Sequence, residues 1–423
     1  MPSPPPTTPA PQGETPSFRT HLPLLDGIRG TAILLVMIFH MTYGIGGWKQ
    51  PEPVHFADRF AQSLFSAGWC GVDLFFVLSG FLITGILYDT KSQSAYFKTF
   101  YARRALRIFP LYYAVVFVSL ILLPAIATHL SASAQAKLAR FGTIEGDQWM
   151  YWTYLSNFAI AQAGKFRHGI LDISWSLAIE EQFYLVWPAI VYFCSRRTLM
   201  RVCVGAIVFA VAFRCVLLAM GTNAIALHVL TPSRVDGLAI GAFIALCVRS
   251  EDGLAKLAAA ARIALPFLLA LVIGDWAFRF LTRSGREGEE GLFSANLPEV
   301  QTVGLTVIGL LFGAILARAV HASQRELAHP EVTRSALVRM FESRLLRLFG
   351  KYSYAMYLFH LPIRAVPRDL LFGKALPSIG GLQLPAQLTF AAGCIAATFV
   401  AAWLSWNLYE KHWLALKRYF EYR

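Results

Sequence analysis

Two ionisable side chains, Arg29 and His40, bracket an apolar stretch near the start of the chain. They are eleven residues apart, close to three helical turns, so in a helix they would lie on nearly one face about 16 Å apart. A charged group inside a bilayer is costly unless it is paired or hydrated, so both residues are candidates for a functional site. The alternatives are an interfacial arginine anchor and a histidine bonded within a helix bundle.

Glu180 and Glu181 are adjacent carboxylates near one end of another apolar stretch. Adjacent helical residues point about 100° apart, so at most one of them faces a given site squarely. By depth alone, one glutamate could meet His40. A carboxylate bonded to one imidazole nitrogen would fix the tautomer and leave the other nitrogen as a general base. This contact is a hypothesis, and a glutamate exposed at a wet helix mouth is the alternative.

A basic block, Arg103, Arg104 and Arg107, ends the loop that follows the second predicted membrane span. Arg104 and Arg107 are three residues apart and share one face of a helix, which suits bidentate hydrogen bonds to phosphate oxygens. A block that simply retains this loop on the cytoplasmic side explains the charge equally well.

Other polar groups also fall within apolar stretches. Asp73 and the pair Arg234/Asp236 are predicted to form structural pairs between helices, and Arg214 is expected to have a carboxylate partner. The glycine beside Ser79, Gly80, fits close helix packing. The residues that remain possible site-lining groups are Asp73, Ser176, Tyr354 and His360.

Long apolar helices must position all these groups. Of the 423 residues, 56% are hydrophobic and 15% are charged, against about a quarter charged in soluble domains. We predict an all-α, polytopic membrane protein of about ten helices, because crossing a bilayer takes about 20 apolar residues. Residues 149–163 are too short for a crossing and are predicted to be interfacial or re-entrant. The predicted spans are 28–46, 70–88, 109–129, 176–195, 203–220, 234–249, 263–281, 300–320, 351–372 and 386–409.

The basic residues predict the orientation and help to define the domains. With both termini cytoplasmic, the richest Lys and Arg blocks all fall on the cytoplasmic side. Residues 1–20, rich in Pro, are predicted to be a disordered cytoplasmic tail, and residues 21–423 a single transmembrane domain. The net charge of +13 is explained by this topology and by attraction to anionic lipid, so no nucleic-acid partner is predicted. The six cysteines lack close pairing, so neither a metal nor a disulfide is predicted.

Five motifs, in this order along nearly the whole chain, resemble those of the membrane acyltransferase-3 family. The resemblance implies about ten helices and transfer of an acyl group, commonly acetyl, from acyl-CoA. Family acceptors include O-antigen, exopolysaccharide, peptidoglycan, lipid-linked sugars and macrolides. The motifs are Leu25-Asp-Gly-Ile-Arg29 with His40, Gly71 to Ile83, Arg104-x-x-Arg107, Ser174 to Tyr184, and Ser353 to His360.

The resemblance also implies roles for individual residues. Arg29 and His40 match the family's essential Arg-x10-His pair, and Arg104 and Arg107 its cytoplasmic Arg-x-x-Arg motif. The acidic pair of the fourth span matches Glu180 and Glu181, and which of them acts stays open. Some members carry a further secreted domain that relays the acyl group, a step expected to be absent here or to belong to another protein.

We therefore expect a membrane O-acyltransferase of the bacterial inner membrane. The phosphates of acyl-CoA would rest on Arg29, Arg103, Arg104 and Arg107 at the cytoplasmic face. His40 would take the proton of the acceptor hydroxyl, or carry the acyl group itself. The expected partners are acyl-CoA as co-substrate, with no tightly bound cofactor, a carbohydrate or lipid-linked saccharide acceptor, and membrane lipid.

The competing function is a secondary transporter or flippase for a lipid-linked saccharide, in which embedded charges line a pathway. Such proteins often have matching halves with broken helices, and the sequence shows no such symmetry. A purely structural scaffold ranks last, because it leaves His40 and the glutamate pair unexplained.

Overall fold

The computed structural model describes residues 22–42, 55–131, 146–166, 169–282, 297–370 and 377–422. Within these ranges the chain is almost entirely helical and has no strand beyond an isolated bridge between Ile379 and Leu382. The all-α prediction is confirmed. The predicted tail, residues 1–20, lies outside the described residues.

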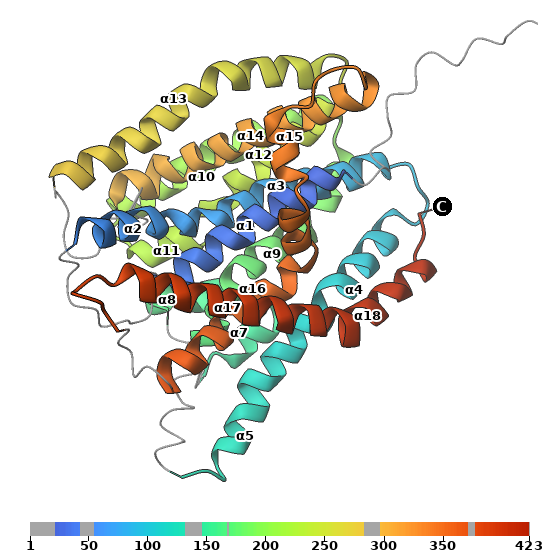
Figure 1. Ribbon diagram of the computed structural model, residues 1–423. Coiled ribbons are helices and arrows are strands. Elements are labelled where there is room, and N and C mark those ends of the chain that lie inside the picture. The colour runs from blue at the N-terminus through green and yellow to red at the C-terminus, as the bar shows by residue number, and fades with distance from the viewer. Residues whose placement is uncertain are drawn as a thin grey trace, which may run out of the picture.

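Long helices form the body of the molecule, and α5 extends away from it (Figure 1). The helices of more than ten residues are α1 (Pro23–Met41), α2 (Phe56–Ser66), α3 (Gly71–Asp89), α4 (Tyr96–Phe117), α9 (Ser174–Phe193), α10 (Arg196–Ala219), α12 (Thr231–Val248), α13 (Gly253–Thr282), α14 (Leu305–Ala328), α16 (Arg344–Leu370) and α17 (Leu384–Ser405). The shorter ones are α5 (Leu123–Ala127), α7 (Gln148–Trp152), α8 (Ser156–Ala163), α11 (Ala224–Val229), α15 (Ala336–Phe341) and α18 (Lys411–Ala415).

Eight helical stretches among the described residues are long and apolar enough to cross a membrane, so the chain is a multi-pass membrane protein. They coincide with eight of the predicted spans. The other two predicted spans fall on α9 and α16, of 20 and 27 residues, which at 1.5 Å per residue are also long enough to cross. α9 is more polar because it carries the glutamate pair, and α16 because it carries several arginines and a lysine.

The segment predicted to be interfacial or re-entrant forms two short helices, α7 and α8, separated by Thr153–Leu155. Tyr154 between them has a positive φ of 56°, which breaks the helical path. Neither helix is long enough to cross a bilayer. The prediction that this segment is not a full span is confirmed.

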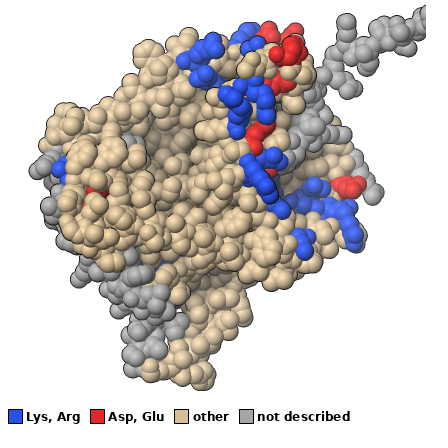
Figure 2. Space-filling model, viewed as in Figure 1, with Lys and Arg blue, Asp and Glu red and all other residues tan. Residues whose placement is uncertain are grey.

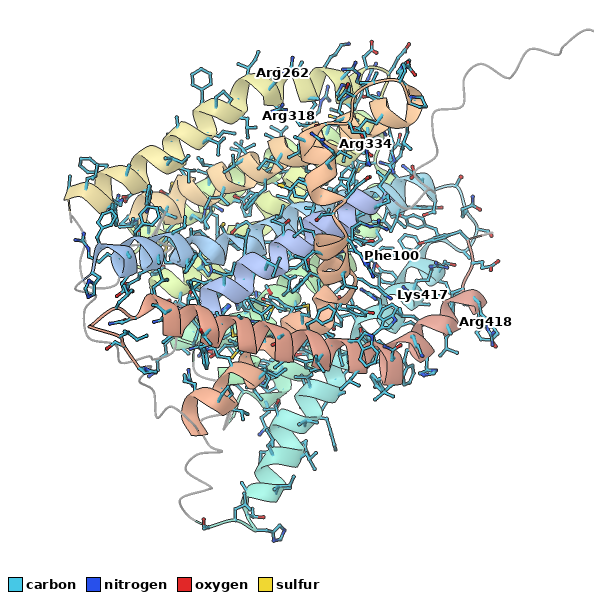
Figure 3. The ribbon with its side chains drawn as sticks, viewed as in Figure 1. Phe100, Arg262, Arg318, Arg334, Lys417 and Arg418 are labelled. Carbon is cyan, nitrogen blue, oxygen red and sulfur yellow. The ribbon has the colours of Figure 1, made fainter. Side chains whose placement is uncertain are left out.

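Lys and Arg side chains gather on one side of the molecule, on the right in Figure 2. Figure 3 labels five of them: Arg262, Arg318, Arg334, Lys417 and Arg418. The start of α1 and the C-terminus lie on the same side (Figure 1). We call this side the basic end.

Glycines allow the helices that carry the site to pack closely. A Cβ added to Gly80 on α3 would lie 1.9 Å from the carbonyl oxygen of Leu238 on α12. A Cβ at Gly350 on α16 would lie 1.8 Å from the carbonyl oxygen of Asp26 on α1. The close packing predicted for Gly80 is confirmed, and the second contact brings α16 against α1.

Two buried ion pairs join α3, α10 and α12. Arg234 donates to Asp73 at 2.6 Å, and Arg214 donates to Asp236 at 2.9 Å. Arg214 also bonds the Thr306 hydroxyl on α14, at 2.6 Å. These contacts confirm the structural pairing between helices that was predicted for these groups. The carboxylate partner expected for Arg214 is Asp236.

Candidate active site

A pocket of about 130 Å³ lies among α1, α3, α4, α9 and α16. One part of its wall is charged and the other is formed by hydroxyl groups and apolar side chains. The polar lining residues are Arg29, Ser79, Arg104, Arg107, Ser176, Glu180, Tyr184, Ser353, Tyr354 and Tyr357.

The positive part of the wall comes from two helices. Arg29 lies in the second turn of α1 and bonds Asp26 at 3.1 Å. Arg104 and Arg107 lie inside α4, which begins at Tyr96, so the loop predicted to contain them is already helical. Their spacing places both on one face, and both line the pocket as Arg29 does.

Aromatic rings hold the two α4 guanidinium groups in place. Arg104 lies 5.5 Å from the ring centroid of Tyr184, and Arg107 lies 5.9 Å from that of Trp406. The face of an aromatic ring attracts a cation without neutralising it. The guanidinium donors therefore remain available for an anion.

Arg103 points elsewhere. It donates to the carbonyl oxygens of Lys417 at 3.4 Å and Phe420 at 2.9 Å, and it does not line the pocket. The predicted group of four arginines thus divides into three that line the pocket and one that holds the C-terminal segment. That segment brings Lys417 within electrostatic reach of all four arginines.

The two adjacent glutamates separate, as their angular offset requires. Glu180 lines the pocket within electrostatic reach of Arg29 and Arg104. Glu181 does not line it, and its buried Oε1 has no hydrogen-bond partner among the described residues. One turn after Glu180, the Tyr184 hydroxyl bonds the Ser79 hydroxyl and ties α9 to α3.

A hydrogen bond between two helices forms part of the pocket wall. The Ser176 hydroxyl on α9 and the Tyr357 hydroxyl on α16 are 2.6 Å apart, and both residues line the pocket. Tyr354 donates to the carbonyl of Ile108 at 2.7 Å. Two of the residues predicted to line a site, Ser176 and Tyr354, therefore do line this pocket, whereas Asp73 does not and pairs with Arg234.

His40 lies outside the pocket lining and contacts a second imidazole. Its Nδ1 is 3.3 Å from Nε2 of His360, and the ring centroids are 4.9 Å apart. Its other hydrogen-bond partner among the described residues is the Val36 carbonyl, at 2.8 Å. The predicted contact with Glu180 or Glu181 is thus replaced by a contact with His360.

Backbone carbonyls fix the tautomers of both rings. A carbonyl oxygen only accepts, so a ring nitrogen bonded to one carries the proton. His360 Nδ1 lies 2.6 Å from the Tyr357 carbonyl and His40 Nδ1 lies 2.8 Å from the Val36 carbonyl. In the neutral rings, the single Nδ1–H of His40 is therefore shared between two acceptors, the Val36 carbonyl at 2.8 Å and Nε2 of His360 at 3.3 Å, and Nε2 of His40 keeps a lone pair for chemistry.

A family model described as an acyltransferase domain matches residues 22–406. The chain belongs to the acyltransferase-3 family. No solved structure matches the chain significantly.

Three relatives of this acyltransferase-3 chain are peptidoglycan or O-acetyltransferases by name. Peptidoglycan O-acetyltransferase OatA of Listeria monocytogenes is 29% identical over 408 residues, 93% of this chain and 56% of that protein. O-acetyltransferase OatA of Staphylococcus aureus is 28% identical over 365 residues, 81% of this chain and 50% of that protein. Putative peptidoglycan O-acetyltransferase YrhL of Bacillus subtilis is 31% identical over 176 residues, 40% and 23% of the two chains. The chain spans about half the length of the first two relatives.

Two charged residues near the site of this acyltransferase-3 protein were missed by sequence reasoning. Arg364 on α16 is only 2% exposed and lies within electrostatic reach of both His40 and His360. Its position four residues after His360, within a predicted membrane span, was an available signal. Lys417 follows the last predicted span, and no spacing pattern connects it to the distant α4 arginines.

Proposed function

We propose that this protein transfers an acetyl group from acyl-CoA to a hydroxyl of a cell-envelope polysaccharide or its lipid-linked precursor. The observation that carries the proposal is a pocket with three arginines at one part of its wall and a line of hydroxyls leading from it towards a histidine pair. Family membership supports acyl transfer as the reaction class.

The arginines suit the phosphates of coenzyme A. Arg29, Arg104 and Arg107 present donors in a fork that matches phosphate oxygens, and Lys417 adds a fourth cation nearby. All four lie towards the basic end, which we place at the cytoplasmic face because positive loops are retained there. Acyl-CoA is supplied from that side, and in a bacterium the membrane would be the inner one.

His40 acts as the general base in this reaction. The acceptor hydroxyl attacks the thioester carbonyl while Nε2 of His40 takes its proton, and the resulting imidazolium returns that proton to the departing thiolate. Tyr357, whose hydroxyl bonds Ser176 in the pocket wall, also lies beside the histidine pair, its ring centroid 5.6 Å from that of His360.

Peptidoglycan is the acceptor we would test first, because two of the relatives bear its name. The test measures transfer of radiolabelled acetyl from acetyl-CoA into base-labile ester, in membranes that contain peptidoglycan precursors. His40→Ala should abolish incorporation at matched expression. His129→Ala, an exposed residue beyond α5, should not change it.

Equal incorporation by wild type and His40→Ala would refute the role of His40. Failure of the wild type with acetyl-CoA across peptidoglycan, lipid-linked and exopolysaccharide acceptors would refute the proposed reaction. In that case, binding of a lipid-linked saccharide without transfer would favour the flippase alternative.

A further inference from the structure

We infer that His360 is the positioning residue for His40, and that it does for this imidazole what a carboxylate does in many general-base pairs. The inference rests on the proposed function, because it assigns His40 a partner in that reaction. It concerns the Nδ1 side of the ring, whereas the chemistry takes place at Nε2.

The geometry of His360 allows it only one role in this pair. Its Nδ1–H is committed to the Tyr357 carbonyl at 2.6 Å, so its Nε2 can only accept. That nitrogen lies 3.3 Å from Nδ1 of His40. His360 is fully buried whereas His40 is partly exposed. His40 can therefore reach the substrate hydroxyl, and the buried ring of His360 holds it in position.

Val36 alone does not supply this function. Its carbonyl lies one turn earlier on the same helix and also takes part in the α1 backbone hydrogen bonds. The Val36 carbonyl can fix the tautomer of His40, but it cannot fix the ring against the rest of the protein because both residues lie on α1. His360 comes from α16 and fixes the ring against a second helix, in a fold where Gly350 lets α16 pack directly on α1.

The hydrogen-bond acceptor that His360 provides matters most when His40 becomes charged. The hydroxyl proton of the acceptor moves to Nε2 of His40, the oxygen–acyl bond forms, and the carbon–sulfur bond breaks. The proton then passes to the coenzyme A sulfur. During this step the Nδ1–H of the imidazolium is a stronger donor, and the lone pair of His360 stabilises it.

Burial decides between positioning and proton relay. His360 is fully buried whereas His40 is partly exposed, so a positive charge costs less on His40 than on His360. The proton therefore stays on His40, and His360 acts as a neutral acceptor throughout. The two glutamates are not needed for this role, since Glu180 lies in the pocket near Arg29 and Arg104.

The test compares His360→Leu with His360→Gln in the purified full chain. Leu removes the acceptor, whereas the amide oxygen of Gln restores one. We expect kcat for acetyl transfer to fall about 10- to 100-fold in His360→Leu, the usual loss when a partner that orients a histidine is removed. The KM for acetyl-CoA should stay within about twofold because the arginine pocket is unchanged, and His360→Gln should recover most of kcat.

A second measurement does not depend on activity. Diethyl pyrocarbonate modifies unprotonated Nε2, and its rate at His40 can be read by peptide mass spectrometry. We expect His40 to react several-fold more slowly in His360→Leu than in wild type or His360→Gln. Equal labelling rates, or a Gln variant as impaired as Leu in a monodisperse preparation, would overturn the inference. If the wild type transfers no acetyl to any of the acceptors while these labelling differences hold, the proposed function fails and the pairing stands.

Discussion

The buried ion pair between Asp73 and Arg234 offers a quantitative test of the fold around the site. Its side chains are 5% and 1% exposed and 2.6 Å apart. Asp73→Asn removes the negative charge and leaves the buried Arg234 guanidinium with weaker partners. These are the new amide oxygen, the His228 ring nitrogen at 3.3 Å, and the rings of Phe76 and Trp175 at 5.4 and 5.7 Å. Removing one partner of a buried pair costs about 3 to 5 kcal/mol.

Because these residual contacts keep part of the stabilisation, we take the lower figure, about 3 kcal/mol. At roughly 2 °C per kcal/mol the apparent melting temperature in detergent should fall by about 6 °C. Glu342→Gln is the matched control, since it breaks an ion pair with the exposed Arg334 at the surface and should leave the melting temperature nearly unchanged.

Thermal unfolding followed by size-exclusion chromatography measures both variants. The double variant Asp73→Asn/Arg234→Gln should be less destabilised than the sum of the single changes, because it removes the unpaired charge. If Asp73→Asn melts within about 1 °C of Glu342→Gln, the pair does not stabilise the bundle and the reasoning is refuted.

Three further predictions concern the pocket and its packing. Arg104→Gln should raise the KM for acetyl-CoA about tenfold with a smaller change in kcat, since it removes a phosphate donor but no reacting group; an unchanged KM would place the phosphates elsewhere. Glu180→Gln should lower acetyl transfer at least tenfold, whereas Glu181→Gln should keep most of it, because only Glu180 lines the pocket; the reverse order of activities would contradict the assignment. Gly80→Val should destabilise the protein by at least about 1 to 3 kcal/mol, seen as a lower melting temperature than that of Gly205→Val, whose position is open.

Hydropathy located the helices because each crossing must be apolar over a nearly fixed length. It placed the start of α4 too late, since the polar and aromatic first turns from Tyr96 onwards are helical without being lipid-like. The same limitation applies to α16, which begins at Arg344 while the predicted span begins at residue 351. Helical propensity and packing, rather than hydropathy, set these boundaries.

Local spacing also predicted which groups share a helix face. Arg104 and Arg107 point into one pocket, and Glu180 and Glu181 point apart. Contacts between helices far apart in the sequence could not be predicted from local spacing. The partner of His40 could have been any polar group at the right depth, and only the close packing of α1 on α16 selects His360 over the glutamates.

The hydrogen bond between Ser176 and Tyr357 joins α9 to α16 in the wall of the arginine pocket. Tyr357 also lies against His360, with the two ring centroids 5.6 Å apart. One aromatic side chain thus contacts both the pocket and the imidazole pair, so a change at Tyr357 is expected to disturb both places at once.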